Sequence, residues 1–438
     1  MCFFNEVLIT NMPKILVLSY FFPPCPLTAS NRVQGIVSNL HKFGFYPIVV
    51  TRHWNQQNDT PNAFLQTTSN MIEHKVLDGY EVYYLPYKSS LRDQCVIKSP
   101  QNKWFAILSK VLTFVQLITE TFSNRFVPFS NLYYFSKDYL LKNKEVKHVF
   151  ISANPFVQFK FGYLLAKKLS IHWIADYRDS WTTNKMATEV RPFNAYLYKY
   201  YRYFEKKWVN SASFFTSVSD SYVNQIEGIL DVKGHTIYNG FTSIQNSTEF
   251  SQTKEFNILY AGTLYYNQPI EAFILSLKKQ KFEFSNTKVV VHFVGLANDP
   301  TQKKRVLEVA EGFESNLLIY EWLSREAYLQ IQNNADLLLM LPYVGFKGIP
   351  SSKLFEYIST SKNILLFGSD NDVIERILVA SKLGFVATNE IELFQYLERL
   401  ILAKSSNNSF LNRDSLNVQD FSINFQTKIL AELIQKHA

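Results

Sequence analysis

Short apolar segments alternate with segments of helical period along most of the chain, which is the pattern of a parallel sheet covered by helices. The first unit of this kind is a strand at Lys14–Ser19, a proline-rich loop, a helix over about Ser30–Phe43 and a strand at Tyr46–Thr51. Further strands of this series are expected at Gly79–Leu85, His148–Ser152, Ile171–Asp176 and Ser213–Val218. The pattern predicts a doubly wound domain.

A second series of the same kind begins with the apolar segment Phe256–Ala261. Its other strands are expected at Lys288–Val294, Leu317–Tyr320, Asp336–Leu341, Ile364–Phe367 and Gly384–Val386. Two series predict an α/β protein of two doubly wound, Rossmann-like domains, residues 1–243 and 244–420, with a polar linker at Thr242–Glu255. Because parallel sheets bind ligands beyond the carboxyl ends of their strands, we expect the two domains to face each other across a cleft.

The last residues of the chain, 421–438, predict one more helix. Its apolar side chains recur at helical spacing, at Phe425, Ile429, Leu430, Leu433 and Ile434. A helix with one apolar face has to pack against another element. This one can pack on either domain, and in one arrangement it crosses back to the first.

The segment that follows the predicted strand Asp336–Leu341 carries the most information about function. A loop with two glycines and a proline ends at Ser351 and Ser352, where a helix begins. A helix N-terminus binds anions such as phosphate, Lys353 adds a positive charge in the first turn, and Glu356 can accept both hydrogens of a ribose diol. Taken alone, a serine cap with an early lysine and glutamate is also ordinary helix-start chemistry, with each group contributing about 1 kcal/mol at best.

A second candidate site ends the predicted strand Ile171–Asp176. Asp176 and Asp179 lie on either side of Arg178, and Trp181 follows. Carboxylates can accept hydrogen bonds from sugar hydroxyls, and a tryptophan ring offers a sugar an apolar face. An Arg–Asp pair that merely fixes the loop explains the same residues, and we weigh the two interpretations equally.

A third candidate site is the loop after the first strand, where Ser30, Asn31 and Arg32 begin a helix. A guanidinium at the carboxyl edge of a sheet can bind an anion or an acceptor. The alternative is an ordinary connection stiffened by proline.

Composition narrows the function classes only slightly. A chain of 438 residues is long enough for two domains, and its net charge of +8 suits an anionic partner without selecting one. The scattered Cys2, Cys25 and Cys95 predict no disulfide framework and a reducing compartment. The N-terminus has no basic start, and we expect no signal peptide.

Several chemistries lack their motifs in this sequence. It contains no GxGxxG, no GxxxxGK[ST] and no HExxH, so the sequence supports neither a dinucleotide site, nor a P-loop, nor that zinc site. Asp370 and Asp372 form a DxD sequence, the pattern that binds a metal in one class of sugar transferases. Because this pair lies in a plain loop after a strand, we expect it to hold no metal.

The segment Lys103–Phe122 predicts an amphipathic helix bearing aromatic residues, with basic residues on it or near it. The apolar positions are Trp104, Ile107, Leu108, Val111, Val115, Ile118 and Phe122, and the basic ones are Lys88, Arg92, Lys98, Lys110 and Arg125. Such a helix suits an anionic membrane surface, although a helix that packs on a sheet has the same periodicity. The run Tyr196–Trp208 allows the same two interpretations, and there we favour packing. No uncharged apolar run is long enough to cross a bilayer.

Taken in order, these segments resemble the GT-B glycosyltransferases of the retaining group 1 (family-4-like) type, which build bacterial surface polysaccharides. The resemblance covers nearly the whole chain and rests on KILVLSYFFPP, ISANPF…IHWIADYRDSW, VSDSY, IYNGF, ILYAGTLY and ADLLLMLPY…PSSKLFEYISTSKNILLFG. It implies transfer of a sugar, with retention and without a metal or cofactor, from a nucleoside diphosphate sugar to a hydroxyl of a glycan or lipid-linked acceptor. It also implies a cytoplasmic enzyme, peripheral on the inner face of the membrane if residues 103–122 bind lipid, with no nucleic-acid partner.

The resemblance also implies roles for individual residues. In this family the carboxylate that corresponds to Glu356 binds the donor ribose, Ser352 and Lys353 face the diphosphate, and the turn Gly262–Thr263 approaches it. The positions on the acceptor side are Ser30, Arg32, Asp176 and Trp181, and the candidate catalytic residues beside them are Asp179 and Arg178.

The sequence departs from the family pattern at two places. Better-known members carry a second glutamate eight residues before the one that corresponds to Glu356, where this chain has Gly348. They also carry an arginine and a lysine after the first strand of the second domain, and this chain has neither. We therefore expect Lys353 to be the main cation on the diphosphate, with Arg32 or Arg178 as a second. No side chain is identified as the base, a role that the departing phosphate can take.

Two other functions fit the same architecture. A nucleotide-sugar epimerase would need histidine and carboxylate acid–base groups in the cleft, and no histidine lies among the candidate site residues. A catalytically degenerate GT-B scaffold is consistent with Gly348, whereas the combination of Lys353 and Glu356 argues against it.

Overall fold

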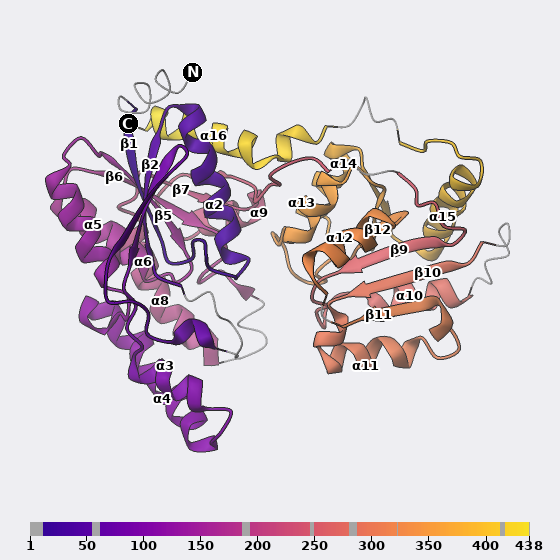
Figure 1. The fold of residues 1–438 in the computed structure, drawn as a ribbon, viewed down its shortest axis with the longest axis horizontal. Coiled ribbons are helices and arrows are strands. Elements are labelled where there is room, and N and C mark those ends of the chain that lie inside the picture. Colours follow the sequence, from indigo (N-terminus) through magenta and orange to yellow (C-terminus); the bar gives the residue numbers. More distant parts are fainter. Residues whose placement is uncertain are drawn as a thin grey trace. The chain divides into compact units, whose positions relative to one another are not determined.

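The computed structural model describes residues 12–54, 62–185, 193–245, 249–279, 287–321, 323–411 and 417–437. The chain divides into two compact units (Figure 1). The N-terminal unit comprises Met1–Tyr238 with Ile423–Ala438, and the C-terminal unit comprises Asn239–Ser422. The boundary expected from the sequence, at residue 243, lies a few residues later.

The N-terminal unit is built on an eight-stranded sheet of order β3-β4-β2-β1-β5-β6-β7-β8. Its strands are β1 (Lys14–Ser19), β2 (Tyr46–Arg52), β3 (Glu73–Leu77), β4 (Tyr80–Leu85), β5 (His148–Ala153), β6 (His172–Tyr177), β7 (Phe214–Ser217) and β8 (Gly234–Thr236). Every pair is parallel except β3 with β4. The strands predicted from the apolar runs are confirmed, and the structure adds the short edge strands β3 and β8.

Helices cover both faces of this sheet. They are α2 (Ala29–Leu40), α3 (Leu91–Lys98), α4 (Lys103–Phe122), α5 (Asn131–Lys142), α6 (Gln158–Lys168), α8 (Phe193–Val209), α9 (Asp220–Glu227) and α16 (Ile423–Lys436). Alternate residues of β1 point to opposite faces, so that Ile15 and Val17 lie in one core cluster and Leu16 and Leu18 in the other.

The C-terminal helix α16 packs on the N-terminal unit, against α2. Ile423, Leu430, Ala431 and Ile434 are buried in the same cluster as Ile15 and Val17. A Cβ atom on Gly35 of α2 would lie 2.7 Å from Cγ1 of Ile423, so the two helices approach closely at this glycine. The predicted helix therefore exists, and the chain returns to the first unit to complete its core.

The C-terminal unit is built on a six-stranded parallel sheet of order β11-β10-β9-β12-β13-β14. Its strands are β9 (Phe256–Ala261), β10 (Val289–Val294), β11 (Leu317–Tyr320), β12 (Leu337–Met340), β13 (Ile364–Phe367) and β14 (Gly384–Ala387). Its helices are α10 (Ile270–Lys279), α11 (Pro300–Val309), α12 (Arg325–Asn333), α13 (Ser352–Ser359), α14 (Val373–Ser381) and α15 (Glu390–Ser405). The predicted α/β class of two doubly wound units is confirmed.

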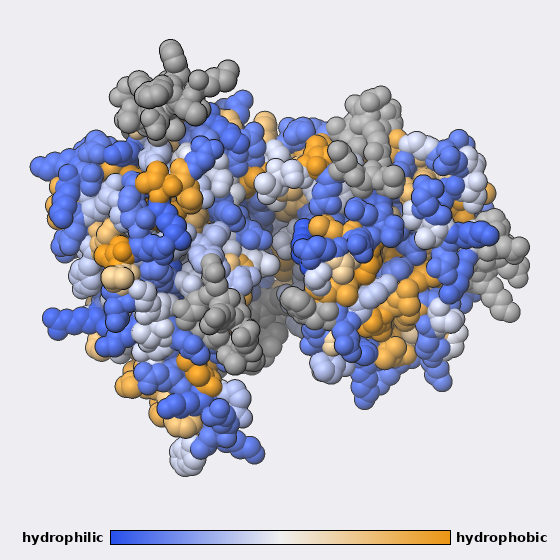
Figure 2. Space-filling model, in the orientation of Figure 1, coloured by the Kyte–Doolittle hydropathy of each residue, from blue (hydrophilic) through white to orange (hydrophobic). Residues whose placement is uncertain are grey.

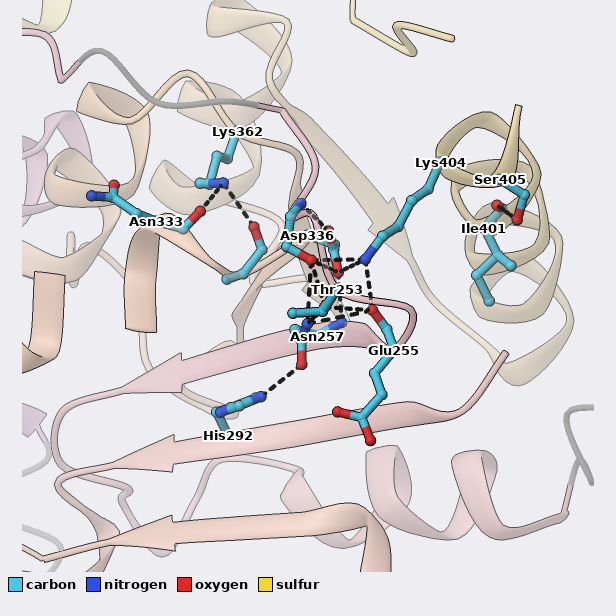
Figure 3. A network of polar contacts seen from close by, with 12 residues as sticks. Thr253, Glu255, Asn257, His292, Asn333, Asp336, Lys362, Ile401, Lys404 and Ser405 are labelled. Atoms are coloured by element: carbon cyan, nitrogen blue, oxygen red, sulfur yellow. Dashed lines mark hydrogen bonds and ion pairs between the residues drawn. The ribbon is translucent and has the colours of Figure 1, made fainter. Parts of the chain in front are cut away.

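The amino ends of the strands in this second sheet are fixed by buried polar contacts (Figure 3). Asp336, just before β12, accepts hydrogen bonds from the backbone amides of Ser251 (2.6 Å) and Asn257 (2.7 Å). Lys404, near the end of α15, donates to Asp336 at 2.8 Å. Every charge in this network has a partner, as buried charges require. The starts of β9 and β12 are therefore joined by paired polar groups.

Candidate functional site

The candidate site in the C-terminal unit lies where the strand order reverses, at the carboxyl ends of β9 and β12. The chain runs from β9 outward to β10 and β11 on one side, and β12, β13 and β14 lie on the other. Loops diverge at such a reversal and leave a crevice, which is where doubly wound sheets bind their ligands. The two segments that flank this position are the turn at Gly262 and the loop that leads into α13.

Two glycines let the loops after β9 and β10 approach each other closely. Gly262 has φ +92° and Gly295 has φ +96°, in the left-handed region that favours glycine. The amide of Gly262 donates to the carbonyl of Val294 at 2.7 Å. A Cβ atom on Gly295 would lie 3.2 Å from the Cα of Gly262. The predicted glycine turn is thus present, and Gly262 and Thr263 are both exposed.

The helix N-terminus that faces this turn has no side-chain cap. Ser351 is the N-cap of α13, yet its hydroxyl accepts no hydrogen bond from the helix. By contrast, Ser324 caps the amide of Ala327 in α12, and Asn389 caps the amide of Glu392 in α15. The amide of Leu354 donates to the carbonyl of Ser351 at 3.0 Å. Among the described residues no side chain caps the amides of Ser352 and Lys353, and the first amides of a helix can bind an anion.

Lys353 extends from the first turn of α13 across the Gly262 turn. Its Nζ lies 3.8 Å from the ring centroid of Tyr260, and a Cβ on Gly262 would be 3.2 Å from its Cε. Lys353 has no ion-pair partner among the described residues. Loss of water around the ammonium group lowers its pKa from the usual value to about 7. The site therefore contains a cation that is poorly solvated and unpaired.

Glu356 lies one turn further along α13 and is held by residues of α12. Arg325 Nη1 donates to Glu356 Oε1 at 2.6 Å, and the guanidinium of Arg325 lies 5.2 Å from the ring of Tyr328. Tyr328 has a raised pKa, chiefly because it is buried and then because the Glu356 carboxylate is near. Sequence reasoning missed Arg325 and Tyr328. The available signal was a charged residue directly after the helix cap Ser324, at the carboxyl edge of the sheet.

The loop before α13 is fixed from the side of α14 by the DxD residues. Asp372 Oδ2 accepts from the amide of Gly348 at 2.6 Å, and Asp370 Oδ2 accepts from the amide of Ile374 at 2.9 Å. Lys347 Nζ donates to the carbonyl of Asn371 at 3.0 Å. The Asp372 carboxylate therefore fixes the loop before α13, and the Asp370 carboxylate binds the first amides of α14. No group of three or more His, Cys, Asp or Glu side chains that could hold a metal occurs among the described residues.

In the N-terminal unit, three of the residues predicted on the acceptor side point into the domain. Asp176 accepts from Arg32 Nη2, Ser152 Oγ and Thr216 Oγ1, each at 2.7 Å. Arg32 Nη1 also donates to the carbonyl of Ile237 at 2.8 Å, and the Ser30 hydroxyl donates to the carbonyl of Leu27 at 2.8 Å.

All three side chains are buried. Their placement does not support a contact with an acceptor at the surface. Instead, the Arg32–Asp176 pair ties α2 to the ends of the central strands.

Trp181 is also buried, in an aromatic cluster. Its ring stacks on Phe156, with centroids 5.0 Å apart and an interplanar angle of 3°, and it packs against Trp208. Its placement likewise does not support the prediction that it offers a face to a sugar. Arg178 and Asp179 lie outside this cluster, where Arg178 Nε donates to Asp179 Oδ2 at 2.9 Å and Asp179 is 50% exposed. Of the predicted block, these two side chains are the accessible ones.

The lowered pKa of Lys353 makes a prediction about stability. The Lys353 side chain loses its proton at about pH 7 in the folded chain and at about pH 10.4 in the unfolded chain. Between these two values the unfolded chain binds more protons, so the free energy of unfolding of the wild type rises with pH. We expect Lys353→Met to be more stable than the wild type at and below pH 7. That advantage should shrink above pH 7, by up to about 1 kcal/mol per pH unit.

Urea unfolding of both proteins across this pH range measures the difference, and titrations of all other groups cancel in the comparison. A difference in unfolding free energy that does not change with pH would contradict the lowered pKa.

Comparison with known proteins gives matches at the level of the fold. No protein-family model matches the sequence, and no significant match is found among curated proteins. A glycosyltransferase from Rickettsia africae is similar in structure over 98% of this chain and 99% of its own, with a TM-score of 0.58 and 11% identity. Anabaena HepE in complex with UDP-glucose (97% and 99% covered, TM-score 0.56, 12% identity) is also similar.

The catalytic domain of starch synthase IV from Arabidopsis thaliana, bound to ADP and acarbose, is a third similar structure (97% and 99% covered, TM-score 0.58, 11% identity). These matches extend over both units and over nearly the full length of each compared protein. The resemblance noted in the sequence is therefore confirmed in the architecture: the chain has the two-domain GT-B fold that these glycosyltransferases share.

Proposed function

We propose that this protein is a glycosyltransferase that binds a nucleoside diphosphate sugar at the carboxyl edge of the C-terminal sheet. The observation that carries the proposal is the unpaired ammonium of Lys353, which lies beside the uncapped N-terminus of α13 and the Gly262 turn. An ammonium group without water or a counter-ion destabilises the empty site. A diphosphate would supply the missing charge, and the free amides would supply hydrogen bonds to its oxygens.

Glu356 completes this donor site as the group for the ribose. A carboxylate can accept hydrogen bonds from both hydroxyls of the ribose diol, and Glu356 lies one turn beyond the amides proposed for the phosphates. Arg325 and Tyr328 hold the carboxylate from the side of α12, so that it does not have to be ordered when the nucleotide binds. HepE with UDP-glucose and starch synthase IV with ADP are nucleotide complexes of proteins with this fold, which supports a nucleotide-sugar donor.

The finer parts of the proposal concern the acceptor and the reaction. We propose transfer with retention and without a metal or cofactor, to a hydroxyl of a glycan or lipid-linked precursor. On the acceptor side we assign Arg178 and Asp179, whose side chains are 22% and 50% exposed, because the other predicted residues of that block are buried. We further propose a cytoplasmic location, in keeping with the free thiols of Cys25 and Cys95.

The donor site is tested by Lys353→Met and Glu356→Ala. We expect each variant to weaken binding of the preferred nucleoside diphosphate by roughly 10-fold or more, because a charge-assisted hydrogen bond contributes about 1.5–3 kcal/mol. A thermal-shift screen of UDP, GDP and ADP first identifies the nucleotide, and calorimetry then measures its Kd. Lys304→Met and Glu308→Ala are matched controls on the exposed face of α11. Nucleotide affinity that is unchanged in both site variants would remove the assignment.

The close approach at Gly262 is tested by Gly262→Ala with Gly312→Ala as its control. Both glycines have positive φ, +92° and +77°, so each substitution should cost about 1–2 kcal/mol of stability. Only the new methyl group at residue 262 meets Lys353, whereas no atom lies within 4 Å at residue 312. We expect nucleotide affinity to fall in Gly262→Ala and to stay unchanged in Gly312→Ala. Equal affinities in the two variants would mean that the Gly262 turn does not border the ligand.

The role of the Arg178–Asp179 pair is tested by Asp179→Ala. We expect this variant to bind the nucleotide normally and to lose sugar transfer by about 100-fold or more, as is typical for a group that acts in the transition state. The assay follows labelled sugar from the identified donor into lipid or glycan extract, with Asp138→Ala as an exposed control in the same unit. Wild-type protein that binds the nucleotide but transfers no sugar to any acceptor would instead support a degenerate scaffold.

A further inference from the structure

Helix α4 exposes an apolar face over most of its length. It spans Lys103–Phe122, and it is the one described helix that is long and apolar enough to cross a bilayer, yet little of it is buried. Lys110 interrupts its apolar stretch, so it is not an uncharged run of that length, and the expectation that no such run occurs is not contradicted. Trp104 and Phe122 are 76% and 70% exposed. A soluble domain seldom leaves such a surface uncovered.

The exposed apolar side chains form one stripe. At 100° per residue, Trp104, Ile107, Leu108, Val111, Val115 and Phe122 fall on the same side of the helix. We call these six residues the α4 stripe. In Figure 1 α4 lies beside α3 at one end of the N-terminal unit, and Figure 2 shows hydrophobic side chains on that part of the surface.

The opposite side of α4 is attached to the domain. Lys160 Nζ donates to the carbonyl of Glu120 at 2.8 Å, and the Tyr201 hydroxyl donates to the carbonyl of Leu117 at 2.8 Å. In the middle of the helix, Arg92 Nε donates to Thr113 Oγ1 at 3.1 Å. These contacts hold α4 lengthwise against its own unit. A helix that crossed a bilayer would have to break them.

Within residues 86–130, which the structure describes in full, the surface beside the stripe is basic and exposes no acid. Residues 86–130 contain six basic side chains and two acidic ones, and both acids, Asp93 and Glu120, are buried. Helix α8 adds exposed Lys199, Arg202, Lys206 and Lys207, while its acid Glu205 is buried.

Helix α8 has two different faces. It packs inward through Tyr201, Phe204 and Trp208, whereas Tyr196 and Tyr203 are 75% and 63% exposed. The ring of Phe122 lies 6.0 Å from that of Phe204, so the end of α4 contacts α8. Packing, the role expected for this run, therefore accounts for only one side of the helix.

We propose that the α4 stripe, with the basic and tyrosine side chains of α8, docks on an anionic membrane surface and lies in the interface without crossing it. An apolar stripe enters the boundary of the acyl chains, while lysines, arginines and tyrosines meet the headgroups. Because the charges that surround the stripe all have the same sign, a second copy of the chain would be repelled. This surface does not depend on the donor site, and its test needs no nucleotide.

The test is flotation of the full chain with vesicles of phosphatidylcholine alone or with about one third phosphatidylglycerol. We expect binding to the anionic vesicles, weakening as salt is raised. The variant Trp104→Asp/Val111→Asp/Val115→Asp should bind at least 10-fold more weakly. Its control is Val379→Asp/Ile391→Asp/Leu402→Asp, which adds the same charge at three exposed apolar sites of the C-terminal unit and should bind like the wild type.

A second measurement follows Trp104 itself. Tryptophan emission should shift to shorter wavelength on anionic vesicles, and Trp104→Phe should bind as well as the wild type but lose most of this shift. Equal binding of the two triple variants, or equal binding to neutral and anionic vesicles, would overturn the proposal. So would resistance to alkaline extraction, which indicates a spanning helix, or self-association in the absence of vesicles that the stripe variant abolishes.

Discussion

The position of Lys353 against the ring of Tyr260 is the contact on which the candidate donor site depends. Three neighbouring features keep the lysine there. Gly262 leaves room for its side chain, Tyr357 accepts a hydrogen bond from the amide of Ala261 at 3.0 Å and so fixes α13 to the end of β9, and the Tyr260 hydroxyl donates toward Thr263 and Gln268. The Lys353 ammonium has no ion-pair partner among the described residues, and its loss of water destabilises the folded protein. An anionic ligand would offset this destabilisation.

The two edges of the C-terminal sheet show how selective this arrangement is. At the amino edge, Asp336 and Lys404 are buried and paired with each other and with backbone groups. At the carboxyl edge, the loops end in glycines and an uncapped helix, and Lys353 is unpaired. The N-terminal sheet also pairs buried charges, Arg32 with Asp176, whereas Arg178 and Asp179 pair with each other and are more accessible. In both units, the buried ion pairs hold secondary-structure elements together, and the candidate site residues lie outside these pairs.

Much of the fold could be predicted because buried parallel strands appear as short apolar runs, and the structure has a strand at each one. The edge strands β3 and β8 were missed because exposure leaves β3, with its sequence EHKVL, without an apolar run, and β8 has only three residues. The donor-site residues were found because they follow β9 and β12 directly. Arg325 lies 31 positions before its partner Glu356, and no local pattern links the two.

Burial was harder to predict from the sequence than secondary structure. Asp176 and Trp181 lie at the carboxyl end of a strand, where functional residues are common. In the structure Asp176 pairs with Arg32, and Trp181 packs in an aromatic cluster. Only the packing of distant helices decides between those roles. The same is true of α4 and α8, whose periodicity fits a buried helix and a membrane helix equally well until the exposed faces are known.

The central claim is that a diphosphate restores the charge of Lys353, and proton uptake on binding measures this most directly. Calorimetry of the preferred nucleoside diphosphate at about pH 8, in buffers of different ionisation heat, counts the protons taken up. The phosphate itself is fully ionised there, since its second pKa is about 6. The account predicts uptake that approaches one proton in the wild type and disappears in Lys353→Met. Tight binding without proton uptake in the wild type would contradict it.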